Sequence, residues 1–156
     1  MRTLRGLTAL ALVAGAIGAA AGHDFHVGAI GVDRARVGPS KVGQREDTAF
    51  MTITNSGKDD VLVAATSSAA SSVELRAAIP TGDGTTMRAL SAIPIPANST
   101  LEFKREGYHL TLVGLNHSFV AGDRIAAMLR FSSGAELIVE FQVDDTIRGE
   151  AKADEK

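Results

Sequence analysis

Apolar and polar residues alternate along most of this chain in short runs, which is the period of a half-buried β-strand. The clearest runs are 48–54 and 73–76, and Gly82-Asp83-Gly84 is a strong turn signal ahead of another. The runs that predict strands cover 25–32, 48–54, 61–66, 73–76, 85–88, 101–104, 108–113, 124–131 and 136–143. Their spacing of roughly 8–12 residues predicts an all-β fold, an antiparallel sandwich or barrel.

Two stretches between these runs predict something other than a central strand. Residues 33–46 are polar, and Gly38-Pro39-Ser40 marks a turn within them, so we expect irregular chain there. Pro94 and Pro96 exclude a central strand, because proline has no N–H to give to a sheet.

The first 22 residues predict a signal peptide. Arg2 and Arg5 precede an apolar stretch at 7–17 that is too short to span a bilayer, and small residues at 18–22 offer cleavage after Ala21 or Gly22. The alternative is a single membrane anchor. We therefore divide the chain into a signal peptide at 1–22, a β-domain at 23–143 and a charged flexible tail at 144–156. The mature protein is expected to be exported to the periplasm.

Composition limits what the exported part can bind. The whole chain has 16 Lys and Arg against 18 Asp and Glu, and both arginines of the signal peptide are lost on cleavage. An acidic surface argues against nucleic acid or an anionic membrane as partner. The chain has no Cys, so a soft metal would have to be held by Met sulfur and His nitrogen. We expect a monomer with no membrane span after cleavage.

Motifs for catalysis are missing from the sequence. It contains no Gly-x-Ser-x-Gly elbow, no His-Glu-x-x-His pair, no phosphate-binding loop and no cysteine nucleophile. The acidic pairs Asp59-Asp60 and Asp144-Asp145 lie in loop or tail contexts, where solvated carboxylates are the ordinary case. We therefore do not expect an enzyme.

Several segments resemble one known family in order and spacing. They are Thr48-Ala49-Phe50-Met51-Thr52-Ile53-Thr54-Asn55-Ser56-Gly57, Val73-Glu74-Leu75-Arg76, the Ile93–Glu102 segment Ile-Pro-Ile-Pro-Ala-Asn-Ser-Thr-Leu-Glu, Gly107-Tyr108-His109-Leu110 and the Gly122-Asp123 turn. This pattern is similar to that of the periplasmic copper chaperones called PCu(A)C, and it covers roughly 23–143. The resemblance implies a cupredoxin-like β-sandwich or barrel that binds Cu(I) and delivers it to respiratory oxidase assembly. It also implies a copper-accepting partner that is periplasmic or membrane-anchored.

The resemblance also implies which positions would hold copper. The family pattern is a His, ten residues, a Met, 21 residues, a His, one residue and a Met. On this chain those positions are Arg76, Met87, His109 and Thr111, with the spacing intact. Arg carries a fixed positive charge and Thr offers a hard oxygen, so both are poor Cu(I) ligands. We expect Met87 and His109 to lie on neighbouring strands with converging side chains, and Arg76 and Thr111 to face solvent.

Each of these residues also has an ordinary structural interpretation. Met87 could fill a gap in the core, since Met packs into irregular spaces. His109 could be an exposed histidine or one whose hydrogen bonds are satisfied. Arg76 could be an exposed charge on a strand, or it could contact a carboxylate of a partner.

His23 and His26 offer a second place for a metal. Cleavage after Gly22 would make His23 the N-terminal residue, with an amine and an imidazole for one ion, and cleavage after Ala21 would make it the second residue. His26 follows three positions later. Nitrogen ligands of this kind suit Cu(II). An alternative is that this segment belongs to the fold and binds no metal.

Two functional classes remain open. In the first, the protein is a copper chaperone whose site is reduced to Met87 and His109 or relocated to the N-terminal histidines. In the second, it is an interaction or assembly-accessory module of the same fold that binds no metal, which Arg76 and Thr111 favour.

Overall fold

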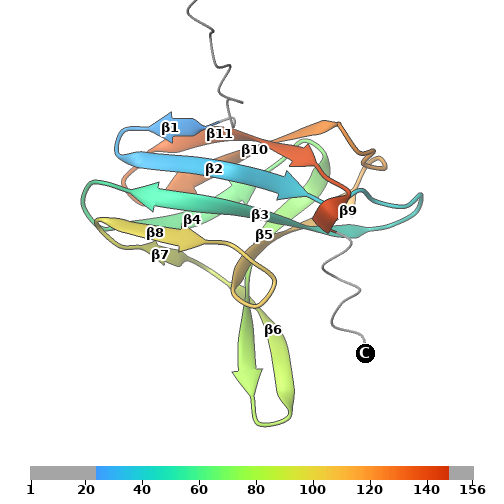
Figure 1. Cartoon of the computed structure of the whole chain (residues 1–156), viewed down its shortest axis with the longest axis horizontal. Helices are drawn as coiled ribbons and strands as arrows, with labels where there is room; N and C mark the ends of the chain where they lie inside the picture. The colour runs from blue at the N-terminus through green and yellow to red at the C-terminus, as the bar shows by residue number, and fades with distance from the viewer. Residues whose placement is uncertain (1–23, 148–156) are drawn as a thin grey trace, which may run out of the picture.

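The computed structural model describes residues 24–147, and predictions for 1–23 and 148–156 lie outside these residues. The described chain forms eleven strands (Figure 1). They are β1 (Phe25–Val27), β2 (Ile30–Val37), β3 (Glu46–Asn55), β4 (Asp60–Thr66), β5 (Ala70–Thr81), β6 (Gly84–Leu90), β7 (Ile93–Ile95), β8 (Ser99–Glu102), β9 (Tyr108–Leu115), β10 (Arg124–Phe131) and β11 (Glu136–Val143). The all-β prediction is confirmed.

Seven of these strands close into a barrel. Their order is β2-β11-β10-β4-β5-β9-β3, and β3 pairs again with β2 to complete the ring. The pairing of β11 with β2 is parallel, through Gln142 opposite Arg36 and Val143 opposite Val37, and the other pairings are antiparallel. Closure removes the free edges that an open sheet would leave.

The core lies inside this ring and follows the alternation of the sequence. On β11, the side chains of Leu137, Val139, Phe141 and Val143 are buried, and the residues between them are exposed. The same alternation on β10 buries Leu129 and Phe131. These two strands match the predicted boundaries, because an unbroken period of two shows directly which face is inward.

The N-terminal strand prediction is wrong in two respects. The run predicted as one strand at 25–32 turns at Gly28, whose φ is 56°, and β2 then continues to Val37, through part of the stretch predicted to be irregular. A bulge explains the second difference. The register against β3 shifts between Asp33 and Arg36, and Arg34 has a φ of 51°. One extra residue breaks the alternation, so the pattern no longer indicates a strand.

The β5–β6 hairpin projects from the barrel (Figure 1). It extends β5 beyond its contact with β9 and returns through β6, which pairs with β5 from Leu75 opposite Leu90 to Thr81 opposite Gly84. Every residue of β6 is exposed except Leu90, which is half-buried. This hairpin carries Met87 to the rim of the pocket described next.

Candidate metal centre

A pocket of about 380 Å³ lies on the outer face of the barrel, where β3, β5 and β9 run side by side. It brings all four family ligand positions together. It is lined by Gly38, Pro39, Gln44, Glu46, Asp47, Thr48, Phe50, Arg76, Met87, Arg105, His109, Thr111 and Ile147. The strand register explains the convergence, because Arg76 on β5 lies directly opposite His109 on β9, and Thr111 follows two residues later on the same face.

His109 is buried, with 4% of its surface exposed. Its Nδ1 lies 3.1 Å from the carbonyl oxygen of Gly107. A carbonyl can only accept, so Nδ1 carries the proton and Nε2 keeps its lone pair. A metal-binding histidine commonly donates its second nitrogen to a carbonyl in this way, which fixes the ring and its tautomer. One ring nitrogen, Nδ1, thus has a hydrogen-bond partner, and Nε2 is the atom that a metal would use.

Burial lowers the pKa of His109 below its usual value of 6.5. The hydrogen bond to Gly107 opposes this shift, and the positive charges of Arg76 and Arg105 reinforce it. The neutral ring, which is the form that binds metal, is therefore favoured at neutral pH.

We expect the apo protein to show a His109 titration midpoint below 6.5, and Arg76→Gln to raise it. In the window between the folded midpoint and 6.5, the unfolded chain binds more protons, so this residue contributes stability that is present above 6.5 and is lost as the pH falls through that window. NMR titration of the His109 ring in both proteins measures the midpoints, with Arg88→Gln as a control for a change of net charge. A midpoint above 6.5 in the native protein would contradict the burial argument.

Met87 lies opposite Ala78 in the hairpin, and half of its surface is exposed. It is therefore not a core residue. The expectation that Met87 and His109 occupy neighbouring strands is wrong, because β5 lies between β6 and β9. Both side chains nevertheless line the same pocket. The long, unbranched side chain of Met suits a position that has to reach across a strand.

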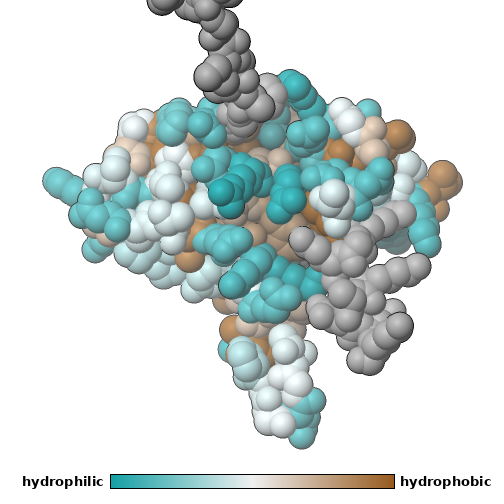
Figure 2. All heavy atoms as spheres, viewed as in Figure 1, coloured by the Kyte–Doolittle hydropathy of each residue, from teal (hydrophilic) through white to brown (hydrophobic). Residues whose placement is uncertain are grey.

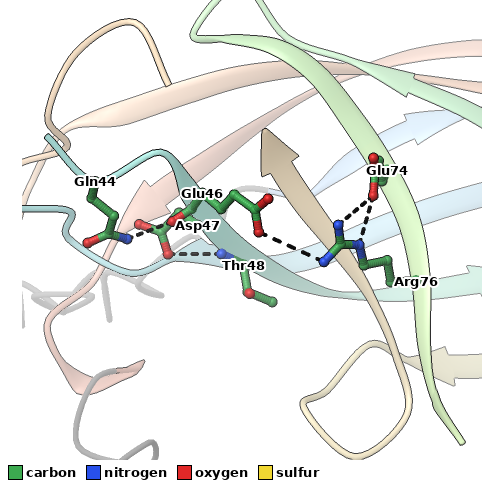
Figure 3. Close-up of polar contacts among 6 residues, drawn as sticks. All are labelled: Gln44, Glu46, Asp47, Thr48, Glu74 and Arg76. Carbon is green, nitrogen blue, oxygen red and sulfur yellow. Dashed lines mark hydrogen bonds and ion pairs between the residues drawn. The ribbon is translucent and has the colours of Figure 1, made fainter. Parts of the chain in front are cut away.

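Arg76 is half-buried and pairs with two carboxylates (Figure 3). Its Nη2 lies 2.7 Å from Oε2 of Glu74, its Nε donates to the same oxygen at 2.8 Å, and Nη1 lies 3.9 Å from Oε2 of Glu46. About a quarter of the Arg76 side chain is exposed. Arg76 is thus only partly exposed, and its guanidinium has carboxylate partners within the protein. Glu74 offsets much of the positive charge that Arg76 brings to the pocket.

Thr111 is buried, with 4% of its surface exposed, so the expectation that it faces solvent is wrong. It lies between Glu74 on β5 and Thr48 on β3. The strands on both sides cover it, which the sequence did not reveal because β3 and β9 are far apart in the chain. Its hydroxyl remains a poor donor for Cu(I).

Of the two N-terminal histidines, the structure describes His26, and it does not line this pocket. His23 lies outside the described residues. His26 is an exposed residue of β1 and pairs with Gly31, which in turn lies opposite Thr54 at the far end of β3. Thr48, beside the pocket, is six residues from Thr54, which is about 20 Å along a strand. A metal held by His26 would therefore occupy a separate site.

Several residues around the site were not singled out from the sequence. Glu46, Arg105 and Ile147 line the pocket, and Glu74 pairs with Arg76 at its side. The sequence could have predicted Glu74 as a neighbour of Arg76, because it lies two residues earlier and strand residues at that spacing share a face. Ile147 falls in the segment predicted to be a flexible tail, yet its side chain is buried, and nearby Asp144 lies 3.7 Å from Arg36. The ordered chain thus extends at least four residues beyond the predicted boundary.

Across 24–147, no helix has the length and apolar character that a membrane crossing requires. Over the same residues, no three His, Asp or Glu side chains gather as they would around a metal ion. The pair of Met87 and His109 differs from such a cluster, because one of its two donors is a thioether.

Comparison with protein families and curated proteins gives one consistent relationship. The model of the LpqE-like family, described as "Putative lipoprotein LpqE-like", matches residues 30–143. The chain is also 37% identical over 117 residues to a protein of Leifsonia xyli subsp. xyli described as "Putative lipoprotein Lxx21020", which covers 74% of this chain and 70% of that protein.

Solved structures with the same fold include PCuAC domains and a protein of Deinococcus radiodurans solved in apo and Cu(I) forms. The copper-bound PCuAC domain from PmoF2 matches with a TM-score of 0.67 at 22% identity, covering 78% of this chain and 97% of that domain. The solution structure of apo-DR1885 from Deinococcus radiodurans matches with a TM-score of 0.59 at 28% identity, covering 92% and 95%. Its Cu(I) form matches with a TM-score of 0.57 at 29% identity, covering 74% of this chain and 78% of that one. The predicted cupredoxin-like fold is confirmed.

Proposed function

Because this chain belongs to the LpqE-like family and has the fold of a PCuAC domain, we propose that it is an exported copper chaperone that carries Cu(I) between Met87 and His109. Copper here is the cargo, taken up from one protein and passed to another. The site is a reduced form of the family pattern, with one imidazole and one thioether.

One observation carries this proposal: the Nδ1 of His109 donates to Gly107, and Met87 lines the same pocket. The pocket is therefore lined by an oriented imidazole and a half-exposed thioether. Packing of the core does not explain this pair, because the Met87 side chain is not buried. Nitrogen and sulfur are the donors that Cu(I) prefers, and two of them suffice for linear coordination. The neutral state of His109 removes the competition between proton and metal at neutral pH.

The residues at the remaining two positions lower the expected Cu(I) affinity but do not prevent binding. The charge of Arg76 opposes a cation, but the carboxylate of Glu74 lies 2.7 Å away and compensates much of it. Thr111 adds no soft donor. A site with two ligands and partial charge repulsion binds copper less tightly than a site with four, which suits a protein that has to release its cargo.

The partner and the compartment follow from the same argument. The names of the relatives describe lipoproteins, which indicates export to the cell envelope, and residues 1–22 have the pattern of a signal peptide. We propose a periplasmic location, a monomeric copper-free form and a copper-accepting partner in respiratory oxidase assembly. The role is binding and transfer, without catalysis. At His23 and His26 we propose a separate and weaker site for Cu(II).

A second candidate function is supported by the ion pairs of Arg76. A guanidinium fixed between Glu74 and Glu46 occupies the place of a family ligand, and such a network stabilises the pocket in the absence of metal. The corresponding function is an interaction module of the same fold, which binds a partner protein and no copper. A Cu(I) titration distinguishes the two.

We expect His109→Ala and Met87→Leu each to lower the Cu(I) affinity by on the order of a hundredfold, which is about 2.7 kcal/mol. Each change removes one of two soft ligands while leaving the barrel core intact. Anaerobic competition with a chromophoric Cu(I) chelator measures the affinity. His117→Ala and Met128→Leu are matched controls, since both residues lie outside the pocket. Native affinity in the His109 and Met87 variants would refute the site and favour the interaction module.

A further inference from the structure

The outer edge of β6 is a row of unpaired backbone groups. In the described chain, β6 pairs with β5 alone. The N–H of Ala78 on β5 donates to the carbonyl of Gly107, on the β9 side, at 3.1 Å. The backbone groups of Ala78 therefore point away from β6. Ala78 and Met87 are directly opposite and do not bond to each other, so the N–H and C=O of Met87 point away from β5.

The same parity holds for the residues two positions away. Thr85 and Ala89 also direct their backbone groups outward, and Met87 lies between them. Figures 1 and 2 show that this hairpin stands clear of the barrel and that most of its residues are neither strongly hydrophilic nor strongly hydrophobic. Arg88 is the one charged residue of this strand. An exposed edge with so few charges is a template for another strand.

The metal site at this edge is short of ligands. His109 and Met87 are the soft donors that line the pocket, and half of the surface of Met87 is exposed at its rim. Among residues 24–147, no methionine besides Met87 lines the pocket, so in the arrangement proposed below a second copy supplies the second thioether. Arg76 and Thr111, at the remaining positions, do not provide one.

We propose that Cu(I) joins two copies of this chain through their β6 edges, with Met87 of each copy bound to the same ion. The proposal rests on the proposed copper site and names a second copy as the partner. In a symmetric antiparallel pairing centred on Met87, the two Met87 residues exchange both backbone hydrogen bonds, and their Cα atoms lie about 5.5 Å apart. Their side chains then project from one face of the joined sheet, close enough to share an ion.

The sequence of β6 is complementary to itself in this register. Thr85 lies opposite Ala89, Thr86 opposite Arg88, and Gly84 opposite Leu90, so no two like charges are directly opposite. The two Arg88 side chains are diagonal neighbours on the face away from the copper. Their mutual repulsion is screened by salt, so the dimer becomes more stable as ionic strength rises.

Sedimentation velocity of the mature protein under anaerobic conditions tests the proposal. We expect a monomer without metal and a dimer after half an equivalent of Cu(I), with the dimer dissociation constant lowered at least tenfold. X-ray absorption at the copper edge should show two sulfur ligands for each ion. Monomeric protein with one copper per chain overturns the dimer and leaves the proposed function standing. Failure to bind Cu(I) in the chelator competition overturns both.

The Ala89→Pro variant tests whether dimer formation depends on strand pairing at β6 as well as on copper. It removes an N–H that β5 does not use, and proline is tolerated at such a position of an edge strand. We expect this variant to fold and to bind copper as a monomer. Arg88→Ala is the matched control, because it keeps every backbone N–H and removes the diagonal repulsion, so it should dimerise at least as well as the native chain. A copper-linked dimer of Ala89→Pro would refute pairing through β6.

Discussion

Arg76→His together with Thr111→Met should raise the Cu(I) affinity by on the order of a hundredfold to ten-thousandfold, or about 2.7 to 5.5 kcal/mol. The pair replaces a fixed positive charge and a hard oxygen with an imidazole and a thioether, both suited to a soft ion. Both positions line the pocket that contains Met87 and His109, so the new ligands would have to move little to reach the same ion. The loss of Arg76 also frees the carboxylate of Glu74 beside the bound cation.

The structure adds a cost that the sequence did not reveal. Thr111 is buried, so a larger side chain there can strain the packing by about 1 to 3 kcal/mol. The neighbouring pocket of about 380 Å³ gives a methionine room to turn outward, and we expect the variant to fold. Thermal unfolding of the apo protein measures this cost.

A matched variant separates charge from ligation. Arg76→Gln with Thr111→Val removes the charge and the hydroxyl without adding a donor, so its affinity should lie well below that of the His and Met pair. Chelator competition on both variants and on the native chain gives the comparison. If the His and Met pair binds Cu(I) no better than this control, the family ligand positions do not apply to this chain, and the N-terminal histidines become the better place for copper.

The strands of the barrel were largely predictable, and the reason is visible in β10 and β11. Each alternates buried and exposed residues without interruption, so a period of two identifies both the strand and its inward face. At β2 the same rule failed, because the bulge between Asp33 and Arg36 changes the spacing of Val32, Ala35 and Val37. A bulge is a local backbone feature with no fixed residue pattern, and here the residue at positive φ is Arg34, which the sequence does not mark as unusual.

Part of the candidate site was also predictable from the sequence. The family spacing named Arg76, Met87, His109 and Thr111, and all four line one pocket. What could not be read is the environment of each residue, because it depends on strands that are distant in the chain. The burial of Thr111 comes from β3 and β5, and the partner Glu46 of Arg76 comes from β3.

The loop that carries Gly38 and Pro39 is a further part of the site that depends on distant residues. It forms one wall of the pocket, and Ser40 in the same loop binds the loop between β9 and β10. The N–H of Phe119 donates to Oγ of Ser40 at 2.7 Å, and the N–H of Ser40 donates to the carbonyl of Phe119 at 3.0 Å. The ring of Phe119 is buried in the main core, so it joins this wall to the barrel.

Phe119→Ala should destabilise the protein by about 3 to 5 kcal/mol, because it removes a fully buried ring and leaves a cavity. For a domain of this size, that corresponds to a fall in melting temperature of roughly 10 to 20 °C, which calorimetry or circular dichroism measures directly. Val120→Ala is the matched control: Val120 is adjacent and 62% exposed, so the same truncation there should change stability by less than about 0.5 kcal/mol. If both variants have the melting temperature of the native protein, Phe119 does not anchor the loop. If Phe119→Ala is destabilised and its folded fraction also binds Cu(I) more weakly, then the wall at Gly38 and Pro39 helps to hold the pocket in shape for His109.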